Sequence, residues 1–236
     1  MKKALILVIF FLIVSFGEGN AQNNIPYLNK NGTATQLIVK NEPFLMIAGE
    51  VHNSSASTEE YMKPLFPKLK AMNLNSVFVT LAWEQFEPKE GFFDYTLVDA
   101  IIDNAKNNNL KVCLLWFASW KNGESSYAPL WVKKDTNRFL RVKTKDGKEI
   151  ETLSPFCEAT KMADARAFAK LMEHIKEYDK EQTVILMQPQ NEVGMFQYIY
   201  YNKVSLDLYK KIVTKQLTSY FNKKKSNLKN YLNYYL

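Results

Sequence analysis

Residues Thr183–Gly194 read TVILMQPQNEVG, and this stretch decides how the rest of the chain is interpreted. It begins with a continuous apolar run, Val184–Met187, which is bounded by polar residues. Such a run is typical of a strand that is buried on both faces. It then passes through amides and a proline to Asn191 and Glu192. The stretch predicts a buried strand with a carboxylate just beyond its C-terminal end. On this stretch alone, Glu192 could instead be an ordinary solvated loop acid or a helix-start residue.

Similar apolar runs occur earlier and alternate with segments of helical periodicity. The runs lie at 43–48, 76–82 and 111–117, and the helical spacing occurs near 58–72, 97–105 and 163–178. Alternation of buried strands with helices predicts an α/β fold with a parallel sheet and right-handed crossovers. Residues 121–157 form a long excursion in which Asp146-Gly147 predicts a hairpin turn. His174 falls on the polar side of the last helix, where it is expected to be an ordinary surface histidine.

Polar and aromatic residues follow each predicted strand at its C-terminal end. In α/β barrels these ends carry the chemistry, since they meet on one rim. Carboxylates, amides and aromatic faces on one rim suit a sugar, whose hydroxyls and CH faces they contact. A single tryptophan at a strand end is more often a core residue than a site residue. The candidates are Glu50, His52, Asn53, Trp83, Glu84, Trp120, Asn122, Asn191 and Glu192.

Several of these stretches resemble a known family. AWEQFEPKEGFFDY resembles the second-strand signature of clan A glycoside hydrolases, W-x-x-x-E-P-x-x-G-x-F-D. GEVHNSSAS, SYAPLWVKKD and NEVG are similar to the bacterial β-galactosidase-like branch of glycoside hydrolase family 35. The resemblance runs from about Gln36 to Met195. The signature falls on Trp83, Glu87, Pro88, Gly91, Phe93 and Asp94.

The resemblance implies a TIM barrel of the (β/α)8 type and retaining hydrolysis of terminal β-galactosides by two glutamates. Glu192 would be the acid/base, and Asn191 would hydrogen-bond the sugar 2-hydroxyl. No metal or cofactor is implied, and the expected partner is a carbohydrate rather than a nucleic acid. The remaining candidates would bind substrate.

Two departures from the family pattern affect this expectation. The family usually has an E-N-E pattern, and here Gln190 replaces the first acid, so a charge beside Glu192 is lost. The family's nucleophile follows strand seven, whereas only 44 residues follow Glu192 and none is a glutamate. The sequence therefore predicts about the first four βα units, within residues 22–196, and an inactive fragment that lacks the nucleophile. A non-catalytic carbohydrate-binding protein is the alternative.

The N-terminal residues are typical of export. Lys2 and Lys3 precede the apolar run Ala4–Phe16, and small residues lead to Ala21. This predicts a signal peptide at 1–21, a periplasmic or extracellular location, and no membrane span after cleavage; an uncleaved anchor is the alternative. Cys113 and Cys157 are too few for a disulfide framework, and the two histidines do not form a metal site with metal-ligand spacing.

The net charge of +7 lies in the last part of the chain. Residues 197–236 hold eight of the 31 Lys and Arg and one of the 24 Asp and Glu, which leaves 23 of each in 1–196. This Lys/Tyr/Asn-rich segment could bind nucleic acid or an anionic membrane. It could also be an amphipathic helix that covers a sheet edge. The composition favours a third interpretation, a frameshifted or non-native segment. The oligomeric state is left open.

Overall fold

The computed structural model describes residues 25–193 and Asp207. The chain divides into two compact units, Met1–Leu45 and Met46–Leu236. The predicted signal peptide lies outside the described residues, and so does the segment 197–236 apart from Asp207. The three interpretations of that segment therefore stay predictions.

The first unit contains a three-stranded antiparallel sheet of β1 (Tyr27–Asn31), β2 (Ala34–Val39) and β3 (Glu42–Pro43). Lys40 and Asn41 join β2 to β3 with φ values of 53° and 65°. Positive φ at both central residues is the signature of the type I′ turn, whose twist matches the flanking strands.

The second unit is built on a parallel sheet whose strand order is β4-β5-β6-β9. This order confirms the parallel α/β sheet expected from the alternation of strands and helices. The strand predicted at 43–48 is displaced, because pairing with β5 begins only at the end of this run. There the Ile47 carbonyl accepts from the amides of Asn75 and Ser76. The strands are β4 (Ala48–Glu50), β5 (Ser76–Ala82), β6 (Lys111–Lys121) and β9 (Val184–Asn191).

Helices connect these strands, as expected for βα units. The last one begins at Glu158, earlier than predicted, and the predicted hairpin forms with Gly147 at a φ of 82°. The hairpin strands are β7 (Arg141–Lys143) and β8 (Glu149–Leu153). The helices are α1 (Glu59–Met62), α2 (Leu65–Ala71), α3 (Trp83–Phe86), α4 (Thr96–Asn107), α5 (Leu130–Lys134) and α6 (Glu158–Tyr178).

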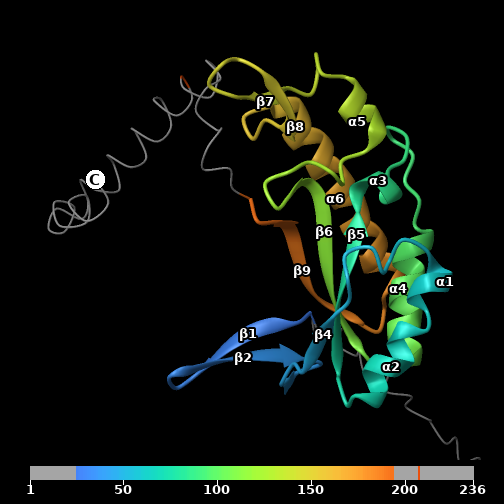
Figure 1. Cartoon of the computed structure of the whole chain (residues 1–236). Helices are drawn as coiled ribbons and strands as arrows, with labels where there is room; N and C mark the ends of the chain where they lie inside the picture. Colours follow the sequence, from blue (N-terminus) through green and yellow to red (C-terminus); the bar gives the residue numbers. More distant parts are fainter. Residues whose placement is uncertain (1–24, 194–206, 208–236) are drawn as a thin grey trace, which may run out of the picture. The chain divides into compact units, whose positions relative to one another are not determined.

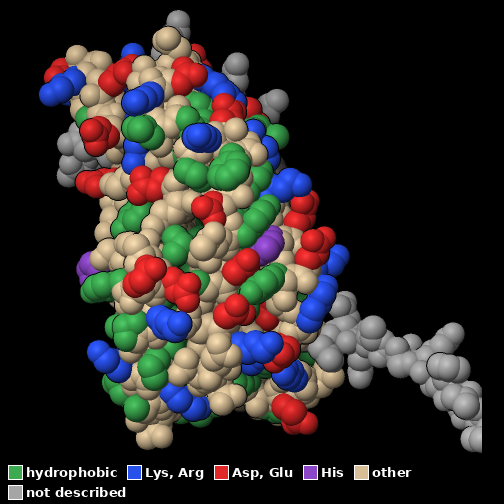
Figure 2. Space-filling view, turned by 90° about the vertical axis from the view of Figure 1, so that its right-hand side faces the viewer, with side chains coloured by type: hydrophobic (Ala, Val, Ile, Leu, Met, Phe, Trp, Pro, Cys, Tyr) green, Lys and Arg blue, Asp and Glu red, His purple; other side chains and the backbone are tan. Residues whose placement is uncertain are grey.

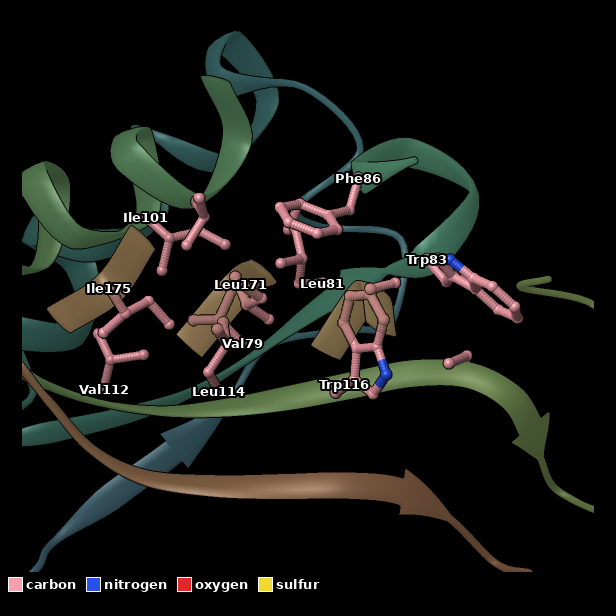
Figure 3. Close-up of a cluster of buried hydrophobic side chains, with 14 of the residues drawn as sticks. Val79, Leu81, Trp83, Phe86, Ile101, Val112, Leu114, Trp116, Leu171 and Ile175 are labelled. Atoms are coloured by element: carbon pink, nitrogen blue, oxygen red, sulfur yellow. The ribbon is translucent and has the colours of Figure 1, made fainter. Parts of the chain in front are cut away.

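The main core lies between the sheet and the helices α4 and α6 (Figures 1 and 3). Alternate residues of β6, such as Val112 and Leu114, point toward Ile175 and Leu171 of α6. The other face of β6 carries Cys113, Leu115 and Phe117, which are also buried. Because both faces are covered, the strand reads as one apolar run instead of an alternating one. The C-terminal ends of β5, β6 and β9 point the same way, which positions the site.

Charged side chains of both signs are interspersed over the face shown in Figure 2. Within the part of the chain that the structure describes, no helix combines the length and apolar character that a membrane span requires.

Candidate active site at the end of β9

Asn191 ends β9 as a half-buried residue, and Glu192 follows it with an exposed side chain. The Asn191 amide is oriented from two sides. Gln188 Nε2 donates to Asn191 Oδ1 at 2.9 Å, and Asn191 Nδ2 donates to Asn122 Oδ1 at 3.2 Å. An amide nitrogen carries two N–H groups, so Asn191 can donate to Asn122 and to a ligand at once.

The backbone ties the ends of β6 and β9 together at the same point. The amide of Asn122 donates to the Asn191 carbonyl at 3.3 Å, and the amide of Gly123 donates to the Glu192 carbonyl at 3.2 Å. Asn122, Gln190 and Glu192 all have left-handed backbone, with φ values of 54°, 64° and 48°. Three of the predicted site residues, Asn122, Asn191 and Glu192, are thus brought together.

Asp164 of α6 stands behind this strand end and was not among the predicted site residues. It is 8% exposed, and its Oδ1 accepts from Trp116 Nε1 at 2.9 Å. Its Oδ2 accepts from the backbone amide of Ser119 at 3.2 Å and from the Ser119 hydroxyl at 2.5 Å. Gln190 Nε2 also donates to this oxygen. One buried carboxylate therefore joins α6, β6 and β9.

Trp83 has a different position from the one predicted. Its side chain is fully buried, at 0% exposure, and its Nε1 donates to Glu87 Oε2 at 2.8 Å. The other oxygen of Glu87 accepts from the amide of Gly91 and from Arg166 Nη2, both at 2.7 Å. As placed, the Trp83 indole presents no face to a ligand, which corrects the predicted aromatic platform at the end of β5. The tryptophan and the glycine of the W-x-x-x-E-P-x-x-G signature are therefore joined by hydrogen bonds to the buried carboxylate of its glutamate, Glu87.

Trp120 is 7% exposed and lines a cavity of about 410 Å³ between α6 and β9. Trp116 and Phe168 line the same cavity, and both belong to the helix-side core cluster. Trp120 is therefore turned toward α6. The predicted stacking of Trp120 on a sugar at the rim needs a different orientation from the one the structure shows.

Glu50 pairs in register with Phe78, which lies four positions before the end of β5 at Ala82. Burial, with a smaller contribution from the charge of Glu50, raises the pKa of the Cys113 thiol to about 11. Cys113 belongs to the cluster on the face of β6 away from the main core. Glu50 is therefore set back from the C-terminal ends of β6 and β9, and it lies near the face of β6 that carries Cys113.

The other predicted binding residues are at or near the surface. His52 is exposed, and its Nδ1 forms a hydrogen bond of 3.0 Å with the Ser54 hydroxyl. Asn53 is half-buried. Glu84 is the second residue of α3 and pairs with Lys133 at 3.2 Å. In the described part of the chain, none of these three residues forms a hydrogen bond or an ion pair with Glu192.

Among the described residues, no three His, Cys, Asp or Glu side chains approach closely enough to hold a metal ion. The expectation that the site needs neither metal nor cofactor stays a prediction.

Comparison with known proteins gives the site a context. Residues 52–232 match the model of glycoside hydrolase family 42, described as β-galactosidase. A β-galactosidase from Xanthomonas manihotis is 25% identical over 169 residues, which are 69% of this chain and 26% of the relative. The chain thus spans about a quarter of the length of that relative. The matched range includes most of residues 197–236, whose origin stays a prediction.

Two solved structures are similar. The catalytic domain of a β-amylase from Paenibacillus polymyxa has a TM-score of 0.54 at 14% identity, covering 72% of this chain and 46% of that chain. An exo-β-1,4-mannosidase from Opitutaceae bacterium strain TAV5 has a TM-score of 0.48 at 17% identity, covering 64% of this chain and 25% of that chain. The β-amylase likeness concerns the fold alone. Together with the parallel βα units, it shows an α/β fold of the (β/α)8 barrel type.

Proposed function

Since the chain belongs to the glycoside hydrolase family 42 of β-galactosidases, we propose that it carries the acid/base part of a retaining β-galactosidase site. The observation that carries the proposal is the pair Asn191 and Glu192 at the C-terminal end of β9. Asn191 has an oriented amide, and Glu192 has an exposed carboxyl group beside it. The substrate is a terminal β-galactoside of an oligosaccharide or polysaccharide.

The chemistry requires two carboxylates. Glu192 protonates the glycosidic oxygen as its bond to the anomeric carbon breaks, while a second carboxylate, ~5 Å away in retaining enzymes, attacks that carbon. Glu192 then takes a proton from the water that releases the sugar. Asn191 donates to the 2-hydroxyl, a contact that strengthens in the transition state. The hydrogen bonds donated by the backbone amides of Asn122 and Gly123 support this role, because they fix the position of Glu192 just beyond the end of β9.

The need for a second carboxylate limits what these residues can do. No glutamate follows Glu192 in these 236 residues. Glu84 is engaged by Lys133, and Glu50 lies below the rim. A polypeptide of these 236 residues is therefore proposed to bind a galactoside without turning it over. A non-catalytic carbohydrate-binding protein would give the same result with an aryl galactoside.

Affinity labelling separates these two functions. N-bromoacetyl-β-D-galactosylamine places an alkylating group where a leaving group would be, so it should esterify Glu192 in the full chain. We expect labelling about tenfold or more faster than by bromoacetamide, because binding orients the reagent. Free galactose should protect the site. Peptide mass spectrometry locates the ester, and Glu192→Gln is the matched control.

The outcomes are distinct. Galactose-protected labelling of Glu192 supports the acid/base role. Galactoside binding in calorimetry without labelling of Glu192 favours the binding protein and contradicts that role. Hydrolysis of an aryl β-galactoside by the purified chain, lost in Glu192→Gln, would overturn the proposal that these residues form an inactive part of the enzyme.

Two finer assignments belong to this proposal. The motifs GEVHNSSAS and SYAPLWVKKD support a place near the family 35 branch of clan A, which a phylogeny built on the strand-end motifs would test. Residues 1–21 support export to the periplasm or the extracellular space. Sequencing the N-terminus of the mature protein tests this, and a mature chain that begins at Met1 would contradict it.

A further inference from the structure

Helix α6 and the residue that ends it hold β9 through two buried aspartates, one toward each end of the strand. Asp164 and Asp179 are each 8% exposed. Asp179, at the C-terminal end of α6, accepts from the amides of Thr183 and Val184 at 2.9 and 2.7 Å, where β9 begins. Asp164 accepts from the Gln190 side chain, where β9 ends. The two carboxylates are equally exposed, and they contact opposite ends of the same strand.

Gln190 connects Asp164 to the proposed catalytic residues. Its Nε2 donates to Asp164 and its Oε1 accepts from the backbone amide of Trp120 at 2.9 Å. Its backbone is left-handed, with a φ of 64°, and that of Glu192 is left-handed with a φ of 48°. Residues with a side chain adopt this conformation only where their surroundings hold them there. Asn191 lies between these two positions.

We propose that Asp164 is a positioning residue for Asn191 and Glu192, acting through Gln190, and that residue 190 is an amide because it must donate to Asp164. The inference rests on the proposed function. A glutamate at 190, as in the E-N-E pattern, would place two carboxylates in contact, where like charges disfavour ionisation of both. The glutamine amide supplies the donor that this contact needs. The carboxylate of the family pattern is thus supplied from α6.

The chain contains its own reporters of this positioning. The amides of Asn122 and Gly123 donate to the carbonyls of Asn191 and Glu192, so their hydrogen exchange follows the catalytic end of β9. The amides of Thr183 and Val184 follow the other end. Exchange measures local opening separately from global stability, which a merely structural role would change throughout the molecule.

The experiment compares the full chain with Asp164→Asn and Asp179→Asn by amide hydrogen exchange. Asp164→Asn should speed exchange at Asn122 and Gly123 about tenfold or more beyond any global change. Thr183 and Val184 should follow the global change alone, and Asp179→Asn should give the reverse pattern. Equal acceleration at all four amides in both variants would overturn the proposal, and so would unchanged protection of Asn122 and Gly123 in Asp164→Asn.

A second variant keeps the test informative if Asp164→Asn does not fold. In Gln190→Glu, one protonated carboxyl group can donate to the other at low pH, so protection of Asn122 and Gly123 should fall as the pair ionises. Cys157 and Lys161 are the titratable residues that line the same cavity as Asp164. A pH profile between 4 and 7 that matches the wild type would overturn the proposal.

A functional readout completes the design. Galactose-protected labelling of Glu192 by N-bromoacetyl-β-D-galactosylamine should slow about tenfold in Asp164→Asn and stay unchanged in Asp179→Asn. If the wild type is not labelled but the exchange pattern appears, the proposed function fails and the positioning stands. If labelling is normal in Asp164→Asn, the positioning fails and the proposed function stands.

Discussion

Glu87 is a carboxylate with no exposed surface, and donors from three parts of the chain hold it. They are the Trp83 indole, the Gly91 amide and the Arg166 guanidinium. Removing a carboxylate from water is costly unless its lone pairs are satisfied by donors. The glutamate of the second-strand signature therefore has a structural duty, to close the turn after β5 and join it to α6. This duty explains why Trp83 lies in the core.

We expect Glu87→Gln to destabilise the folded chain by about 2 kcal/mol, because the amide that replaces one oxygen faces a donor and leaves it unsatisfied. Urea denaturation followed by tryptophan fluorescence measures the loss. The matched control is Glu90→Gln, since the exposed Glu90 pairs with Arg138 and Arg166 at the surface. That change should cost less than about 1 kcal/mol. Equal losses in the two variants would contradict the structural role of Glu87.

Cys113 should be chemically inert in the folded chain. Burial, and then the charge of Glu50, raise its pKa to about 11, so at pH 8 only about one thiol in a thousand is a thiolate. Alkylation of Cys113 by iodoacetamide at pH 8 should therefore be at least about 100-fold slower in the folded chain than in urea. Peptide mass spectrometry measures both rates, and rapid modification of Cys113 in the folded chain would contradict the structure.

The same shift has a consequence for stability. The folded chain keeps the Cys113 proton up to about pH 11, whereas an unfolded thiol loses it near pH 8.5. The folded state therefore binds more protons than the unfolded state between these values. Its contribution to stability is complete below about pH 8.5 and is lost as the pH rises toward 11.

At the scale of elements, the parallel strands β5, β6 and β9 could be predicted because a parallel strand buried on both faces is an uninterrupted apolar run. The position of Glu192 just beyond β9 follows from that run. The role of Asp164 could not be predicted, because its donors belong to β6 and β9 and meet only in the folded chain. Trp83 was misplaced for a similar reason. Position at a strand end does not determine whether an indole turns outward or toward a glutamate one helical turn later.

His174 shows the limit of helical periodicity in the same way. It was expected on the polar side of the last helix, yet its side chain is only 19% exposed. Its ring stacks on Tyr95 with centroids 4.0 Å apart, and Nε2 lies 2.5 Å from Asp99 Oδ1. Asp99 lies on α4, which a single helix pattern cannot reveal. His174 therefore joins α4 to α6 and is not an ordinary surface histidine.

His174→Ala should weaken the packing of α4 against α6 and so destabilise the folded chain. It removes an aromatic stack and a hydrogen bond, which together are worth about 1–3 kcal/mol. Urea denaturation measures the change. Glu177→Ala is the matched control, because Glu177 is an exposed residue of the same helix and alanine favours helix formation. A His174→Ala variant as stable as the wild type would show that the stack does not hold α4 against α6.

For the whole molecule, charge separates the chain into parts with different behaviour toward polyanions. Residues 1–196 carry 23 bases and 23 acids, and residues 197–236 carry eight lysines and one acid. Both signs are interspersed on the face shown in Figure 2. A balanced surface has no net field to attract phosphate or sulfate groups, whereas clustered lysines release counterions when they bind them.

We therefore expect any binding of polyanions to reside in residues 197–236 and to disappear with salt. The full chain should be retained on immobilised heparin at about 50 mM salt and released by about 200 mM, because each phosphate or sulfate contact steepens the salt dependence. A chain that ends at residue 196 should not be retained at either concentration. Retention of the shorter chain would contradict the charge balance, and binding of duplex DNA by the full chain at high salt would indicate a nucleic-acid site that the proposed function does not include.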